Sequence, residues 1–111
     1  MTLRSARIEL SGWGRFSSET CVVFRPESRS SLVAALTSDC GTVIPRGLGR
    51  SYGDSAVNPD GVVLQERLGR ILELDEAGLT VTCEAGTSLA RLLSFLLPRG
   101  YFLPVVPGTR F

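Results

Sequence analysis

Histidine is missing from this sequence of 111 residues. Without it, the chain carries no Ser-His-Asp triad, no histidine-bearing zinc site and no histidine general base. Cysteine is scarce as well: Cys21, Cys40 and Cys83 are odd in number and widely spaced. That spacing indicates neither a disulfide framework nor a CxxC metal site, so we predict small buried thiols and no metal centre.

The chain also lacks an excess of either charge and any long hydrophobic run. Its 12 basic residues, which are arginines, face 11 acidic ones, and a net charge of +1 gives no general attraction for nucleic acid or a membrane surface. The start MTLRSARIEL has no stretch typical of a secretion signal, and no segment approaches the ~20 apolar residues of a membrane span. We therefore expect a cytoplasmic protein without a nucleic-acid partner or a membrane span.

The first half of the chain predicts a β-α-β unit. The β-rich run 21–24 indicates a strand that ends before Pro26. Ser28 is suited to cap a helix that ends at Gly41, and residues 42–44 indicate a second strand. Two strands joined in this way are expected to run parallel with a right-handed crossover.

The second half predicts another strand at 62–65, a hairpin of 70–75 with 79–84, and a helix capped by Thr87. Pro98 and Gly100 should stop that helix, whose leucines have helical spacing and are expected to pack in the core: Leu89, Leu92, Leu93, Leu96 and Leu97. The fold class is therefore α+β, a mixed sheet with a β-α-β unit, a hairpin and packed helices. The chemistry of such a fold is expected in its loops.

The stretch PRGLGRSYGD at 45–54 is the main candidate site. Its glycines match neither the GxGxxG dinucleotide pattern nor a Walker A loop. They permit positive φ angles, so that successive main-chain N–H groups can converge on an anion, with Arg46, Arg50 and the Ser51 hydroxyl beside them. Tyr52 adds a ring that can pack against a flat heterocycle. The alternative on these residues alone is a glycine-rich turn with solvated arginines.

PRGLGRSYGD also resembles the phosphate-binding loop of FAD-binding domains in the vanillyl-alcohol-oxidase-type, or PCMH-type, flavoproteins, and most of all the branch around decaprenylphosphoryl-ribose oxidase. Four further segments match that family in the same order: LSGWGR at 10–15, GVVL at 61–64, EAGTSLARLL at 84–93 and PVVPGTR at 104–110. The resemblance covers nearly the whole chain. It implies an N-terminal segment at 1–20, followed at 21–111 by the N-terminal part of an FAD-binding domain.

The resemblance implies FAD as cofactor, for an oxidoreductase that acts on a CH–OH group of a sugar-like small molecule. The implied pyrophosphate-binding residues are Arg46, Gly47, Leu48, Gly49, Arg50, Ser51, Tyr52 and Gly53, with Tyr52 toward the isoalloxazine. Pro107, Gly108 and Thr109 are implied to begin a second cofactor-contacting segment. No catalytic residue is expected within this chain.

Several other residues in and near these motifs are expected to have structural roles only. Trp13 is expected to pack, Asp54 to anchor a turn, and Asp75 and Glu84 to be solvated strand residues. The family continues past PGTR with the rest of the FAD domain and a substrate domain, so we expect an excised or truncated piece that binds FAD weakly or not at all by itself. The competing hypothesis is a stand-alone anion- or nucleotide-binding module without redox activity.

Overall fold

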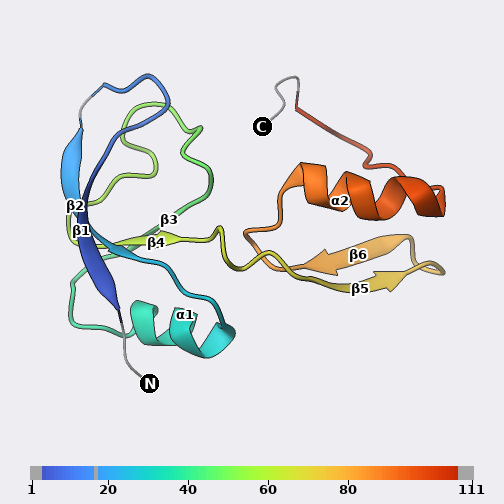
Figure 1. The fold of residues 1–111 in the computed structure, drawn as a ribbon, viewed down its shortest axis with the longest axis horizontal. Coiled ribbons are helices and arrows are strands. Elements are labelled where there is room, and N and C mark those ends of the chain that lie inside the picture. The colour runs from blue at the N-terminus through green and yellow to red at the C-terminus, as the bar shows by residue number, and fades with distance from the viewer. Residues whose placement is uncertain (1–3, 17, 108–111) are drawn as a thin grey trace. The chain divides into compact units, whose positions relative to one another are not determined.

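The computed structural model describes residues 4–16 and 18–107. The chain divides into two compact units, Met1–Leu68 and Gly69–Phe111. Each unit combines β-strands with a helix (Figure 1). The predicted α+β class with a mixed sheet is thereby confirmed. Within this part of the chain, neither helix is long and apolar enough to cross a membrane.

The first unit is built on a four-stranded sheet of order β1-β2-β4-β3. Its strands are β1 (Ser5–Leu10), β2 (Glu19–Phe24), β3 (Ile44–Arg46) and β4 (Val62–Leu64). β1 is antiparallel to β2, and β4 is parallel to both β2 and β3. The two strands of the predicted β-α-β unit therefore point the same way, with β4 between them. β3 begins two residues later than the predicted strand 42–44, which makes Arg46 its last residue.

Both faces of this sheet are covered, which explains the continuous apolar runs in β2 and β4. On one face, Cys21, Val23 and Val62 pack with Val57 from the loop between β3 and β4. On the other face, Phe24 and Val63 pack with Ala35 of the helix. β1 was not predicted, because its side chains are mostly exposed and leave no apolar signal at this edge of the sheet.

Helix α1 (Arg29–Leu36) begins as predicted, because Ser28 and Ser31 form a reciprocal capping box. It ends earlier than predicted: Thr37 is the C-cap, and its hydroxyl donates to the Val33 carbonyl at 2.8 Å. Gly41 does not end the helix. Gly41 lies instead in the connection to β3, with a φ of +96°.

The second unit holds the predicted hairpin, formed by β5 (Ile71–Asp75) and β6 (Thr80–Cys83). α2 (Leu89–Leu96) lies along this hairpin and continues into the 3₁₀ turn η1 (Leu97–Arg99), as Figure 1 shows. Ser88 rather than Thr87 caps α2, because the Ser88 hydroxyl accepts the Arg91 N–H at 3.1 Å. Gly100 ends the segment with a φ of +84°.

The leucines of α2 are only partly buried. Leu92 and Leu96 are 8% and 3% exposed, whereas Leu89 and Leu97 are 38% and 54% exposed. The expectation that all of them form core is therefore wrong for these two residues at the ends of the helical stripe.

Glu84 also differs from its expected role as a solvated residue. Its side chain is 14% exposed and forms a bidentate pair with Arg70, with Nε–Oε1 at 2.8 Å and Nη2–Oε2 at 3.1 Å. These side-chain hydrogen bonds, together with one from the Arg70 main-chain N–H, hold the pKa of Glu84 below its ordinary value. Asp75 is exposed as expected, and its carboxylate accepts the Gly78 N–H at 3.0 Å.

Candidate functional site

The candidate loop, residues 47–53, leaves the end of β3 and is called the glycine loop below. Two of its three glycines have positive φ angles: Gly49 at +75° and Gly53 at +58°. A side chain at either position would strain the backbone. The two glycines thus suit the path of the loop, in which the main chain turns twice within a short stretch.

Six main-chain N–H groups of the glycine loop have no hydrogen-bond acceptor among the described residues. Among the described residues, no hydrogen bond is made by the N–H groups of Gly47, Leu48, Gly49, Ser51, Tyr52 and Gly53. Five of these six residues are exposed and Gly49 is half-buried. Buried main-chain donors are normally paired within the protein, whereas exposed ones bind water. Several accessible donors close together can therefore bind an anion.

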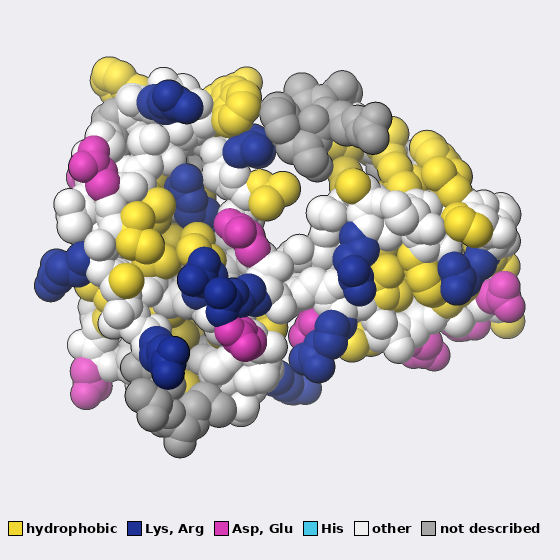
Figure 2. Space-filling view, in the orientation of Figure 1, with side chains coloured by type: hydrophobic (Ala, Val, Ile, Leu, Met, Phe, Trp, Pro, Cys, Tyr) yellow, Lys and Arg dark blue, Asp and Glu magenta, His cyan; other side chains and the backbone are white. Residues whose placement is uncertain are grey.

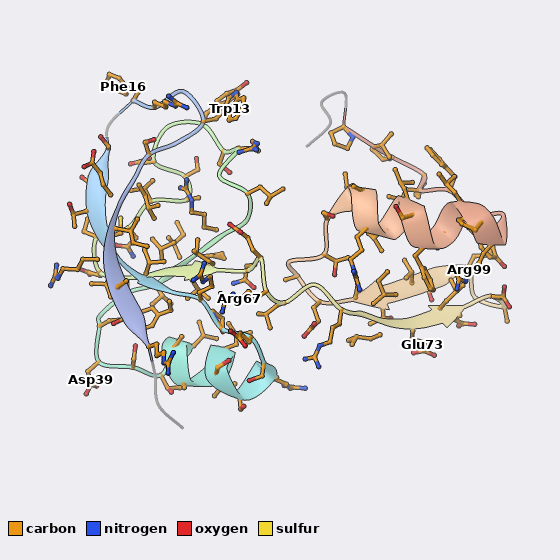
Figure 3. All side chains as sticks on the ribbon, viewed as in Figure 1. Trp13, Phe16, Asp39, Arg67, Glu73 and Arg99 are labelled. Carbon is orange, nitrogen blue, oxygen red and sulfur yellow. The ribbon has the colours of Figure 1, made fainter. Side chains whose placement is uncertain are left out.

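A second segment, residues 11–16 between β1 and β2, holds the glycine loop from one side. The Trp13 N–H donates to the Ser51 carbonyl at 2.8 Å. Gly12 packs so closely that an added Cβ would lie 2.2 Å from the Gly53 carbonyl oxygen. Figure 3 shows Trp13 and Phe16 at the end of the first unit where this segment lies. The segments LSGWGR and PRGLGRSYGD are therefore in direct backbone contact.

Arg46 contacts both loops. Its Nη2 donates to the Ser11 carbonyl at 2.8 Å, and its Nη1 donates to the Ala56 carbonyl at 3.2 Å. The side chain is half-buried, with its guanidinium next to Gly49. Arg46 therefore lies at the base of the glycine loop.

Arg50 and Tyr52 lie on the exposed part of the loop. The Arg50 guanidinium lies 4.7 Å from the centre of the Trp13 ring, and its Nη1 donates to the Leu48 carbonyl at 2.7 Å. Tyr52 is 76% exposed. A cation and a flat ring are thus presented beside the run of main-chain donors.

Elsewhere the charges are mixed. Figure 2 shows basic side chains scattered over the visible face of each unit, with acidic ones among them. The described residues contain no group of three or more His, Cys, Asp or Glu side chains that could hold a metal ion. Any attraction of the glycine loop for an anion would therefore come from nearby hydrogen-bond donors rather than from a broad basic surface.

Of the predicted site residues, the structure brings together Arg46 through Gly53. Pro107 lies in the irregular stretch after η1, while Gly108 and Thr109 lie outside the described residues. Asp54 sits in the turn 53–56, where its main-chain carbonyl accepts the Val57 N–H at 3.1 Å. Anchoring of the turn by its carboxylate stays a prediction.

Sequence reasoning missed the role of Gly12 and Trp13. Trp13 was expected to pack, yet it is 44% exposed and contacts the glycine loop through both its N–H and its ring. The available signal was the pair of glycines in GWGR, since a glycine is needed where two backbones approach closely.

Comparison with known proteins supplies a family. The model of the FAD binding domain family matches residues 21–111. The decaprenylphosphoryl-beta-D-ribose oxidase of Mycolicibacterium smegmatis is 41% identical over 106 residues, which cover 91% of this chain and 23% of that protein. The chain thus spans about a quarter of the length of this curated relative.

Solved structures give the same fold. Cholesterol oxidase from B. sterolicum matches with a TM-score of 0.63 at 18% identity, over 87% of this chain and 20% of that one. A variant of cholesterol oxidase from Brevibacterium sterolicum matches with a TM-score of 0.65 at 17% identity, over 89% of this chain and 23% of that one. At such low identity, the likeness extends to the fold alone.

Proposed function

Because the chain belongs to the FAD-binding-domain family of FAD-linked oxidases, we propose that residues 46–53 form the part of its FAD site that receives the pyrophosphate. The chain then contributes the N-terminal part of the domain to a longer flavoprotein. Residues 107–109 are proposed as the start of a second contact with the cofactor.

The observation that carries this proposal is the set of six N–H groups in the glycine loop that find no acceptor in the described part of the chain. A pyrophosphate presents several anionic oxygens, and hydrogen bonds to charged groups contribute about 1.5–3 kcal/mol each. Gly49 and Gly53 permit the backbone to turn its donors toward one point, and Arg50 adds positive charge. The residues present fit a diphosphate.

When bound, FAD supplies a two-electron acceptor for oxidation of a carbinol. The residues of this chain are assigned to binding: the N–H groups fix the phosphates, and the exposed Tyr52 ring is placed to pack against the flat part of the cofactor. The carbinol proton is proposed to leave to a base outside residues 1–111.

The substrate is proposed to be a sugar-like CH–OH compound, as the name of the M. smegmatis relative suggests. The alternative, an anion- or nucleotide-binding module without redox activity, predicts that the bound nucleotide stays oxidised whatever alcohol is added. Anaerobic bleaching of the flavin by ribosyl glycolipids, with cholesterol as the comparison alcohol, separates the two hypotheses.

The loop assignment is tested by titrating the flavin-free full-length gene product with FAD, FMN and riboflavin. FAD offers two phosphates, FMN one and riboflavin none, so affinity should fall in that order. Addition of FAD should also slow amide exchange at residues 47–53. Equal affinities for FAD and riboflavin, or unchanged exchange in the loop, would place the phosphates elsewhere.

A further inference from the structure

We propose that Arg46 is a positioning residue, which holds the glycine loop in its donor-presenting conformation and acts on FAD through that loop rather than by touching a phosphate. This inference rests on the proposed function, because it concerns the same site. The two arginines of PRGLGRSYGD, Arg46 and Arg50, then have different roles.

Two carbonyl oxygens carry the argument. Arg46 donates to Ser11 O at 2.8 Å and to Ala56 O at 3.2 Å. Neither carbonyl accepts another hydrogen bond within the described part of the chain. A planar guanidinium holds two acceptors in a fixed relation, which a point charge does less well. Arg46 therefore ties together two segments that are distant in sequence.

The positions of these carbonyls link Arg46 to the loop. Ser11 precedes Gly12, whose backbone packs directly on Gly53. Ala56 ends the turn 53–56 and is 8% exposed, so it is anchored in the first unit. By holding one point on each side, Arg46 fixes where the far end of the glycine loop lies.

The guanidinium also supports the near end of the loop. A Cβ on Gly49 would lie 2.6 Å from Arg46 Nη2 and 3.3 Å from its Cζ. The guanidinium therefore lies in contact range of the loop backbone, on a half-buried side chain, whereas Arg50 is exposed. Loss of Arg46 removes this support and leaves two carbonyls without their partner.

The test compares Arg46→Met, which keeps an unbranched apolar stem but no donor, with Arg46→Lys, which keeps one charged donor group. Arg25→Met is the matched control, because Arg25 is exposed and forms no hydrogen bond or ion pair with other described residues. Amide exchange is measured at Trp13 and Val57 in the flavin-free full-length protein, and FAD affinity is then titrated.

For Arg46→Met we expect exchange at Trp13 and Val57 to accelerate before any FAD is added, and the Kd for FAD to rise on the order of tenfold or more. Arg46→Lys should restore part of both losses, and Arg25→Met should change neither. Should Arg46→Met fail to fold, Arg46→Lys answers the same question with smaller shifts in the same two measurements.

The inference is overturned if the Arg46 variants weaken FAD binding while Trp13 and Val57 exchange at wild-type rates, since Arg46 would then be a direct phosphate ligand. Unchanged exchange with unchanged affinity overturns it as well. Failure of the proposed function looks different: FAD would leave the exchange of residues 47–53 unaltered in the wild-type protein.

Discussion

Two of the exposed loops contain glycine at a turn, the glycine loop at 47–53 and the hairpin loop at 76–79. In the hairpin loop, the Asp75 carboxylate accepts the Gly78 N–H at 3.0 Å. The glycine loop has six N–H groups for which the described residues offer no acceptor. The two loops therefore differ in how many donors have no acceptor among the described residues: six in the glycine loop, and three, those of Glu76, Ala77 and Leu79, in the hairpin loop.

Such a difference is expected between a turn that supports the fold and a loop that we propose binds an anion. In the hairpin loop, a local side chain accepts the Gly78 N–H and so supports the turn. Around the glycine loop, the neighbouring groups bind carbonyls instead: Trp13 N–H takes Ser51 O, and Arg46 takes Ser11 O and Ala56 O. These contacts engage carbonyl acceptors and no loop N–H group, so the six donors have no acceptor among the described residues, which suits an anion.

Among the variants that test this comparison, Gly12→Ala is expected to have the largest effect on the glycine loop. Its Cβ would lie 2.2 Å from the Gly53 carbonyl oxygen and 3.0 Å from the Ser51 carbonyl oxygen, so the two backbones must separate. We expect a loss of about 1–3 kcal/mol in the free energy of unfolding, from overpacking, and loss of FAD from the full-length protein. Denaturant unfolding and the flavin absorbance of the purified protein measure the two effects.

Gly14→Ala is the control for that variant, since an added Cβ at Gly14 meets nothing within 4 Å. It should purify with its full flavin content. If both variants retain flavin equally, close contact between segment 11–16 and the glycine loop does not shape the cofactor site.

The next largest effect is expected for Gly49→Val. Gly49 has a φ of +75°, and an added Cβ would lie 2.6 Å from Arg46 Nη2. A β-branched residue disfavours this conformation, so the loop should rearrange and FAD affinity should fall about tenfold or more, with the hairpin unaffected. Gly47→Ala, where a Cβ meets no atom within 4 Å, should bind FAD as the wild type does. Equal titrations for the two variants would contradict the assigned role of Gly49.

Asp75→Ala acts on the other loop. It removes the acceptor for the Gly78 N–H, and loss of such a turn hydrogen bond costs about 1 kcal/mol. Amide exchange in β5 and β6 should accelerate while the FAD affinity of the full-length protein stays unchanged. A fall in FAD affinity would mean that the hairpin loop also serves the cofactor.

Much of the local structure of the two loops and their neighbouring elements could be predicted from the sequence. The period-two pattern of 79–84 predicted the hairpin, and the leucine spacing predicted α2, because local patterning and packing agree in these elements. PRGLGRSYGD predicted a loop with positive φ angles, and the structure confirms positive φ at Gly49 and Gly53. These features depend on residues close together in the chain.

What sequence reasoning missed depends on long-range contacts. β1 is an edge strand with exposed side chains, so only its pairing with β2 identifies it. The contacts of Arg46 with Ser11 and of Trp13 with Ser51 join residues more than 30 positions apart. The Arg70–Glu84 pair closes the base of the hairpin, where a lone acidic residue after a strand gave no hint of its partner.

That pair provides the smallest expected effect and extends the comparison to pH. Arg70 lowers the pKa of Glu84, so the pair stabilises the hairpin at pH values above the ordinary glutamate pKa of 4.5 and loses this effect as the pH falls through the lowered pKa. In Glu84→Gln, amide exchange in β5 and β6 should be faster than in wild type near neutral pH, and the difference should vanish on acidification.

Glu73→Gln controls for the change of charge, because the Glu73 side chain is exposed and forms no hydrogen bond or ion pair with another described residue. The effect should be modest, since the Arg70 side chain is exposed and ion pairs at the protein surface contribute little. A difference that persists undiminished in acid would mean that Glu84 supports the hairpin through packing rather than through its charge.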